Sequence, residues 1–271
     1  MKEVDAALAR AYAPRDKGDP PRGVPPAPHW SGLVSLRATA PEPTPDFVPE
    51  PAAAVAWTEP ATAVELQWPP VVLTLERECG PRFDRLAEHL IAARRRQNLR
   101  VLLFTSCHRA EGRTTLVLTL ARALSRHPCR TVLVDADVSG PMLARLLGLR
   151  PQIGLDDVIE HGQALADAVL DAPEDHLAIL PLRAAVARPR DFLDSPAWAC
   201  AVARLRRDYD LILLDGGPLF TGLSAAVLHR AVDAAVLVHH RGLSGERALL
   251  RAREVLERGG VPLLGVAETF V

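Results

Sequence analysis

A run of small and polar residues between two apolar segments is the part of this chain best suited to chemistry. Residues 101–121 read VLLFTSCHRAEGRTTLVLTLA: an apolar stretch, a polar loop, and a second stretch with helical spacing. The loop contains Gly112, Arg113 and Thr114, and a glycine there lets the backbone close around a small anion. The helix that follows would present unpaired N–H groups and the positive end of its dipole. The pattern therefore predicts a phosphate-binding loop.

Arg113 stands where the Walker A pattern Gly-Lys-[Ser/Thr] carries its lysine. The chain contains two lysines, Lys2 and Lys17, which indicates a general preference for arginine over lysine. Arg113 would then be a nearly neutral replacement of the lysine, provided that the site tolerates an arginine. Such tolerance is unusual, because a lysine ammonium is a compact charge that fits between the β- and γ-phosphates, whereas a guanidinium is a wide planar fork. We therefore expect phosphoryl transfer to be weakened or absent.

Carboxylates follow two other apolar segments. Asp135 and Asp137 end the stretch TVLVDAD, and Asp215 ends the stretch LILLD. Each aspartate alone is more often a turn residue or a helix cap, but three at the ends of expected strands, after a phosphate-loop candidate, favour a nucleotide site. Such carboxylates bind Mg²⁺ directly or through water, and Thr114 would add a hydroxyl ligand. The expected magnesium ligands are Thr114, Asp135 and Asp215.

The elements that must position these residues alternate along the chain. Strands that are apolar on both faces and separated by helices indicate a doubly wound α/β fold with a mostly parallel sheet. The loops after such strands lie along one edge, where ligands bind. A helix is expected to begin after Pro81. The expected strands are Val101–Thr105, Thr131–Val134, Leu177–Leu180, Leu211–Leu214, Ala235–Val238 and Leu263–Val266, and the clearest expected helices are Thr114–Arg126, Ala197–Arg207 and Glu246–Arg258.

The chain divides near residue 70. Residues 1–15 have the spacing of a short amphipathic helix. Residues 16–70 are rich in proline and alanine, with too little apolar surface to offset the cost of ordering, which predicts a disordered linker. Residues 71–271 form the predicted nucleotide-binding domain.

Composition narrows the class of protein further. The formal net charge is −1, which gives no general attraction to nucleic acid, and no nucleic-acid partner is expected. The four cysteines are scattered, as is typical of a reducing compartment. The charged first residues do not resemble a signal peptide, and no apolar run approaches the length of a membrane span. These features predict a cytoplasmic protein.

Several segments together resemble the bacterial tyrosine kinases (BY-kinases) of capsule and exopolysaccharide synthesis, within the MinD/ParA-like P-loop ATPases. The loop resembles TSxxPGEGKST, and VLVDADVSGPMLARLLGL followed by GLDDVI resembles the family's Walker A′ region. YDLILLDGGPL resembles the Walker B segment YDxIIIDTPPV, and DFLDS resembles ELLxS. The similarity runs from about residue 83 to 271, in the family's order and spacing.

The resemblance implies a set of functional residues and ligands. ATP or ADP with Mg²⁺ would be the cofactors, and Arg113, Asp135, Asp137 and Asp215 would take the catalytic positions. A membrane-embedded polysaccharide co-polymerase or chain-length regulator would be the partner, which would place the protein at the inner face of the membrane, and a homo-oligomer is a further expectation. The implied nucleotide-binding residues are Ala110, Glu111, Gly112, Arg113, Thr114 and Thr115.

Departures from the family pattern favour a degenerate member. The Pro-Gly that precedes the family's Walker glycine is Arg109-Ala110, and the arginine pair of DADLRRP is Ser139-Gly140. The ring-assembly motif Glu-x-x-Arg-x-x-Arg falls on Pro81, Asp84 and Ala87, and the asparagine expected near the base falls on Thr269. There is no C-terminal tyrosine cluster, since the two tyrosines are Tyr12 and Tyr209, the latter at a framework position.

These observations leave three functions open. The first is an ATP-binding, BY-kinase-like protein of polysaccharide synthesis or export with impaired phosphoryl transfer and a regulatory role. The second is a Min/Par-type ATPase that positions or gates a partner, and the third is a scaffold without nucleotide. Two other features are expected to be structural and not functional. The side chains of His239 and His240 would point to opposite faces of a strand, and Cys107 would be a small residue that fits where the loop turns.

Overall fold

The computed structural model describes residues 62–221 and 231–269. The predicted helix over residues 1–15 lies outside these residues, as does the linker up to residue 61. The strands are β1 (Thr62–Ala63), β2 (Val101–Ser106), β3 (Thr131–Ala136), β4 (Leu170–Ala172), β5 (Leu177–Leu180), β6 (Leu211–Gly216), β7 (Ala234–His240) and β8 (Leu263–Thr269). The helices are α2 (Pro70–Gln97), α3 (Arg113–Leu124), α4 (Leu143–Leu146), α5 (Leu155–His161), α6 (Leu165–Ala168), α7 (Pro189–Leu193), α8 (Pro196–Asp208) and α10 (Glu246–Arg258), with 3₁₀ turns η2 (Pro173–Asp175) and η3 (Leu219–Thr221).

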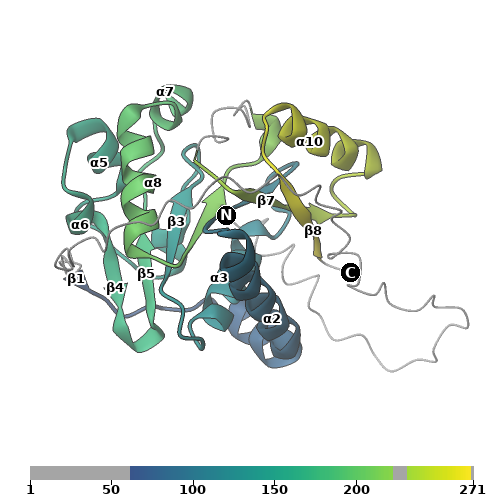
Figure 1. Ribbon diagram of the computed structural model, residues 1–271, viewed down its shortest axis with the longest axis horizontal. Helices are drawn as coiled ribbons and strands as arrows, with labels where there is room; N and C mark the ends of the chain where they lie inside the picture. The colour runs from purple at the N-terminus through teal and green to yellow at the C-terminus, as the bar shows by residue number, and fades with distance from the viewer. Residues whose placement is uncertain (1–61, 222–230, 270–271) are drawn as a thin grey trace, which may run out of the picture. The chain divides into compact units, whose positions relative to one another are not determined.

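The strands form one eight-stranded sheet in the order β1-β4-β5-β3-β6-β2-β7-β8 (Figure 1). All neighbouring strands pair in parallel except β4 and β5. The predicted doubly wound, mostly parallel α/β fold is confirmed. The short antiparallel strand β4 has no signal in the sequence, because its three residues carry no pattern of their own.

Helices cover both faces of the sheet, and each face has its own hydrophobic core. On one face α2, α3 and α4 pack against the sheet through residues that include Val72, Leu90 and Leu120. On the other face α5, α8 and α10 contribute residues that include Trp198 and Leu256. The central strands β2, β3 and β6 are buried along their whole length, which explains why they read as continuous apolar runs.

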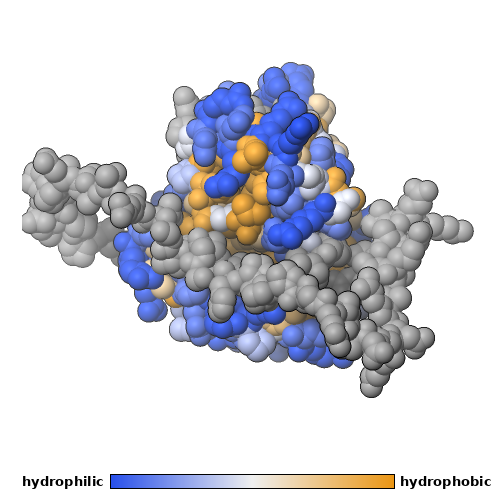
Figure 2. Space-filling model, turned by 90° about the vertical axis from the view of Figure 1, so that its right-hand side faces the viewer, coloured by the Kyte–Doolittle hydropathy of each residue, from blue (hydrophilic) through white to orange (hydrophobic). Residues whose placement is uncertain are grey.

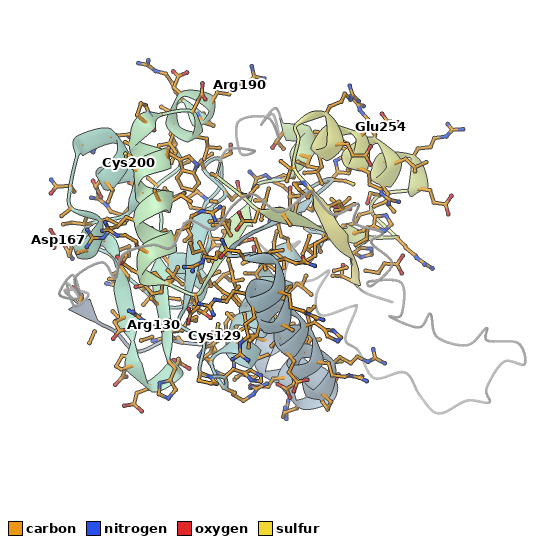
Figure 3. The ribbon with its side chains drawn as sticks, viewed as in Figure 1. Cys129, Arg130, Asp167, Arg190, Cys200 and Glu254 are labelled. Carbon is orange, nitrogen blue, oxygen red and sulfur yellow. The ribbon has the colours of Figure 1, made fainter. Side chains whose placement is uncertain are left out.

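The carboxyl ends of the parallel strands meet at one edge of the sheet. Figure 3 shows Arg130, just before β3, at the opposite end of the sheet from Arg190 of α7. Cys129 and Cys200 are likewise well apart in this view, and the cysteines of the described residues are free thiols. The predicted phosphate loop follows β2, and the predicted acids end β3 and β6. The topology therefore brings these three segments to the same edge.

The helix expected to begin after Pro81 begins instead at Pro70, so that prediction is wrong at its start. Pro81 lies inside α2, where it removes one backbone hydrogen bond but stays exposed to solvent. Burial of Val72 on one side of it and of Ala87 on the other compensates for this loss, because both pack in the core shared with α3. The described fold also starts earlier than residue 71, since Thr62 and Ala63 pair with β4.

The strand β8 lies at one edge of the sheet, next to α10. Most of its residues are only partly buried, and Leu250 of α10 is 57% exposed. Figure 2, which faces the side where α10 and β8 lie, shows hydrophobic side chains gathered among charged ones. No helix among residues 62–221 and 231–269 is long and apolar enough to cross a lipid bilayer.

We predict that replacing Pro81 with alanine stabilises the protein. Alanine restores the missing N–H donor within α2 and favours helix, which should raise the free energy of unfolding by about 1–3 kcal/mol. Urea denaturation measures the change. Arg82→Ala, at the neighbouring exposed position, is the control and should change stability by less than about 0.5 kcal/mol. A Pro81→Ala variant no more stable than the parent would contradict this account of α2.

Candidate functional site

The loop between β2 and α3 is closed by its own side chains. The Ser106 hydroxyl donates to the carbonyl of His108 at 2.7 Å, and the His108 N–H donates to a carboxylate oxygen of Glu111 at 3.0 Å. Gly112 has a φ of 82°, which is the left-handed conformation that glycine adopts without strain. The backbone therefore turns sharply just before the first residue of α3, as the sequence predicts.

Ala110 keeps a glycine-like conformation although it carries a Cβ atom. Its φ is 63°, in the left-handed region. That conformation costs a residue with a Cβ roughly 1–2 kcal/mol. The alanine at the position of the family's glycine thus strains the loop.

The N–H groups of the first turn of α3 are available to a ligand. No side chain caps the start of α3, and the backbone hydrogen bond at this end of the helix runs from the N–H of Leu116 to the carbonyl of Gly112 at 2.9 Å. The N–H groups of Arg113, Thr114 and Thr115 precede that bond, at positions that a helix leaves without an intrahelical acceptor. These donors lie at the positive end of the helix dipole. Such an array fits a phosphate group without help from any side chain.

The side chain of Arg113 turns toward the sheet. It is 9% exposed, and its Nε donates to Asp215 at 3.0 Å while one terminal nitrogen donates to Asp137 at 2.9 Å. The other terminal nitrogen donates to the hydroxyl of Ser106 at 2.9 Å. The guanidinium therefore joins the ends of β3 and β6 to the end of β2.

Thr114 and Asp215 are also joined directly. The Thr114 hydroxyl donates to the second carboxylate oxygen of Asp215 at 2.7 Å, so both oxygens of this aspartate are engaged. Burial raises the pKa of Asp215, while Arg113 and the threonine hydroxyl act in the opposite direction. Asp215 thus depends on its two partners for its charged state.

Asp137 has one engaged oxygen and one without a partner. Its Oδ2 pairs with Arg113 and more weakly with Arg109, whose Nη1 lies 3.4 Å away. Among the described residues nothing donates to its buried Oδ1. Gly140, at a position where the family has an arginine, leaves space for Arg109, because a Cβ there would lie 2.7 Å from Nη1. One departure from the family pattern therefore accommodates another.

Asp135 supports a turn. Its Oδ2 accepts hydrogen bonds from the backbone N–H groups of Met142 (2.9 Å) and Leu143 (3.0 Å), where α4 begins. Burial, followed by the nearby charge of Asp215, raises its pKa from 3.8 to about 7. The structure thus places Asp135 beside Asp215 in paired strands but directs its carboxylate to α4.

The predicted magnesium ligands come together only in part. Thr114 and Asp215 are hydrogen bonded to each other, Asp135 bonds to α4, and Arg113 pairs with Asp215. Within residues 62–221 and 231–269, no group of three or more His, Cys, Asp or Glu side chains is arranged to hold a metal ion. The donor set does not fit a divalent ion while Arg113 is present, and the magnesium ligands stay a prediction.

A second network anchors the loop from the other side. The carboxylate of Glu111, 1% exposed, accepts from the hydroxyl of Ser244, and His239 shares a 2.7 Å hydrogen bond with the Ser244 carbonyl. Thr269, at the position of the base-reading asparagine, donates its hydroxyl to the Glu111 carbonyl at 2.7 Å. The loop motif predicts a functional position for Glu111, but nothing in the sequence predicts that Ser244 contacts it.

The remaining sequence interpretations agree with the structure. His239 is buried beside Ser244, which is a structural role. Cys107 is buried, and burial raises the pKa of its thiol to about 11, so it is not a reactive thiolate. Tyr209 packs on the core beneath Arg130, and burial raises its pKa to about 12.

Known proteins share this fold and sequence pattern. No protein-family model matches the chain. The tyrosine-protein kinase CpsD of Streptococcus pneumoniae is 27% identical over 169 residues, which cover 62% of this chain and 74% of that protein. The kinase domain of VpsO is 25% identical with a TM-score of 0.62, covering 70% of this chain and 95% of that domain. MinD from Pyrococcus horikoshii OT3, complexed with Mg-ADP, is 27% identical with a TM-score of 0.50, covering 62% of this chain and 68% of MinD.

The mostly parallel sheet and the loop between β2 and α3 define a P-loop NTPase domain of the MinD-like class. Within that class, the similarity to tyrosine-protein kinases and their kinase domains supports a member of the bacterial tyrosine kinase family. Its homologues include tyrosine kinases named CpsD, YwqD, CapB and Wzc.

We predict that Asp135 makes stability fall as pH rises. Its pKa in the folded protein, about 7, lies above the value of about 4 expected in the unfolded chain. The folded state therefore holds a proton that the unfolded state has lost, and this stabilisation is complete below about pH 4 and disappears as pH rises through 7. Asp135→Asn keeps an acceptor for Met142 and Leu143 but does not titrate.

Urea denaturation at about pH 5 and about pH 8 tests this. From the lower to the higher pH, the free energy of unfolding of the parent should fall by a few kcal/mol more than that of Asp135→Asn. This is the size that a pKa raised from about 4 to about 7 implies. Equal pH dependence in the two proteins would show that Asp135 is ionised throughout.

The conformation of Ala110 gives a separate prediction. A β-branched residue tolerates positive φ poorly, so Ala110→Val should lower the free energy of unfolding by about 1–3 kcal/mol. Ala110→Gly should leave it within about 1 kcal/mol of the parent, because relief of strain offsets the greater freedom of the unfolded chain. Thermal denaturation of the two variants distinguishes them, and equal effects would exclude a strained Ala110.

Proposed function

We propose that this protein binds ATP or ADP and acts as a BY-kinase-like regulator of capsular polysaccharide or exopolysaccharide synthesis or export, with impaired phosphoryl transfer. The observation that carries the proposal is that the backbone and the side chain at the start of α3 face different partners. No side chain caps the first turn of α3, while the guanidinium of Arg113 is bonded to Asp137 and Asp215. The groups that bind phosphate are thus available, and the group at the position of the catalytic lysine is engaged elsewhere.

Backbone donors support nucleotide binding independently of the lysine. They come from the loop and from the first turn of α3, and Gly112 gives the phosphates close access to them. The related MinD structure contains Mg-ADP, which agrees with a nucleotide in this fold. In the proposed complex residues 110–115 surround the phosphates.

The contacts of Arg113 support impaired transfer. A lysine of a Walker A loop stabilises negative charge on the transferred phosphoryl group, and that interaction matters most in the transition state. Here the guanidinium is buried and bonded to two carboxylates. Tyr209 is packed on the core, so it is a poor acceptor of phosphate.

The partner and the location are part of the same proposal. Several homologues are tyrosine kinases of the CpsD and CapB type. By analogy with the family, we infer a membrane-embedded polysaccharide co-polymerase or chain-length regulator as partner and a location at the cytoplasmic face of the membrane. The partly buried β8 edge, with Leu250 nearby, is a surface where this partner or a second copy could pack.

A Min/Par-type switch is the second candidate. The similarity to nucleotide-bound MinD favours it, at an identity comparable with that to CpsD. Such a protein would dimerise when it binds ATP and act without transferring phosphate to tyrosine. Light scattering with ATP and with ADP separates the two candidates, because the switch requires a dimer specific to ATP.

Isothermal titration calorimetry tests the first part of the proposal. The intact protein should bind ADP and ATP, and Gly112→Val should abolish binding because a bulky side chain at this turn blocks the approach of the phosphates. Gly162→Val is the matched control, since Gly162 also has positive φ but lies in open space at the end of α5. Absence of binding by the parent protein would favour a scaffold that works without nucleotide.

ATP turnover tests the second part. Arg113→Lys supplies a compact charge and should raise turnover by about tenfold, short of the hundredfold that roughly 3 kcal/mol of transition-state stabilisation would give. Mass spectrometry after incubation with Mg-ATP should find little or no phosphotyrosine in the parent protein. A parent protein as fast as Arg113→Lys would show that its catalysis is not impaired.

A further inference from the structure

Arg113 bonds to two of the three aspartates at this edge of the sheet, and one of them, Asp215, is a predicted magnesium ligand. Its Nε contacts Asp215 and one terminal nitrogen contacts Asp137, at 3.0 and 2.9 Å. Both carboxylates are almost fully buried, and two buried negative charges need a counter-charge close by. The guanidinium supplies it from within the chain.

The position of Arg113 is fixed by more than charge. Its third hydrogen bond, to Ser106, ties the guanidinium to the end of β2 as well. Because guanidinium is planar and its donors point in set directions, three acceptors at the carboxyl ends of three strands define its orientation. To leave this position, Arg113 would have to give up all three bonds and expose or neutralise two buried carboxylates.

Arg113 does not have to move for a nucleotide to bind. Three of the five N–H groups of its guanidinium donate to Asp215, Ser106 and Asp137. Arg113 is the first residue of α3, so the phosphate-binding N–H groups of the proposed complex belong to its backbone and to the residues that follow it. These backbone groups can bond to a phosphate oxygen while the guanidinium stays on Asp137 and Asp215.

We propose that Arg113 replaces the divalent cation of this site, so that the protein binds the phosphates of a nucleotide without a metal ion. To bind Asp137 and Asp215, a divalent ion would have to displace the guanidinium of Arg113. If the guanidinium stayed in place, its positive charge would repel the ion. This inference rests on the proposed nucleotide binding, but its claim about the carboxylates applies to the free protein as well.

The first experiment contains no nucleotide. Thermal denaturation of the full chain is followed with EDTA, with Mg²⁺ and with Mn²⁺ for the parent, Arg113→Met and Arg109→Met. Arg113→Met leaves Asp137 and Asp215 without a counter-charge, so added metal should raise its melting temperature through binding to the folded state. The parent and Arg109→Met should not respond, since Arg109 is half exposed and only weakly paired with Asp137.

The metal responses decide the claim about the free protein. A parent melting temperature that rises with metal as much as that of Arg113→Met overturns the proposal. So does an Arg113→Met variant that ignores metal, because its carboxylates then form no cation site. If Arg113→Met does not fold, Arg113→Lys takes its place, since a lysine cannot bridge both carboxylates in the same way.

The second experiment measures ADP binding by calorimetry in Mg²⁺ and in EDTA. The dissociation constant of the parent should agree within about twofold between the two buffers, while that of Arg113→Lys should be at least about tenfold weaker in EDTA. A parent protein that needs Mg²⁺ as much as Arg113→Lys overturns the proposal, since the arginine would then have left the carboxylates. No ADP binding in either buffer contradicts the proposed function instead, and the nucleotide-free experiment then decides the role of Arg113.

Discussion

The contacts of one guanidinium group hold the functional edge of this protein together. Asp137 and Asp215 come from different strands and are buried side by side with Arg113, which supplies their positive charge. Removing one partner from such a group leaves an uncompensated charge in a medium that solvates it poorly. The start of α3, the end of β2 and the ends of β3 and β6 therefore depend on the same interaction, and the shape of the phosphate loop depends on them.

Under the proposed function, the same interaction separates phosphate binding from phosphoryl transfer. Phosphate can be bound by backbone N–H groups, whose positions follow from the helix and the two left-handed residues before it. Acceleration of transfer requires a charge that follows the phosphoryl group into the transition state. A side chain held by three acceptors is poorly suited to that task. Under the proposed function, one substitution lowers turnover and leaves the backbone N–H groups at the start of α3 in place.

Most of the fold could be predicted from the sequence, because the central strands are buried on both faces and read as apolar runs that end in polar residues. The start of α2 could not, because Pro81 has the sequence character of a helix start while the contacts that override it, through Val72 and Ala87, are distant in sequence. The residue types of the sequence predict the loop and its acids. They do not predict the partners of Arg113, since its side chain is held by Asp137, 24 residues away, and by Asp215, 102 residues away.

Ala110 has a consequence for the thermodynamics of ligand binding. Glycine, the family's residue at this position, samples many backbone conformations, so a loop built with it loses entropy when it closes on a ligand. Alanine samples fewer, and here it already holds the left-handed conformation. Part of the conformational entropy of the loop is therefore lost on folding and not on ligand binding, and the folded protein is strained at Ala110. A loop prepared in this way should bind phosphate with a smaller loss of entropy than its glycine-containing relatives.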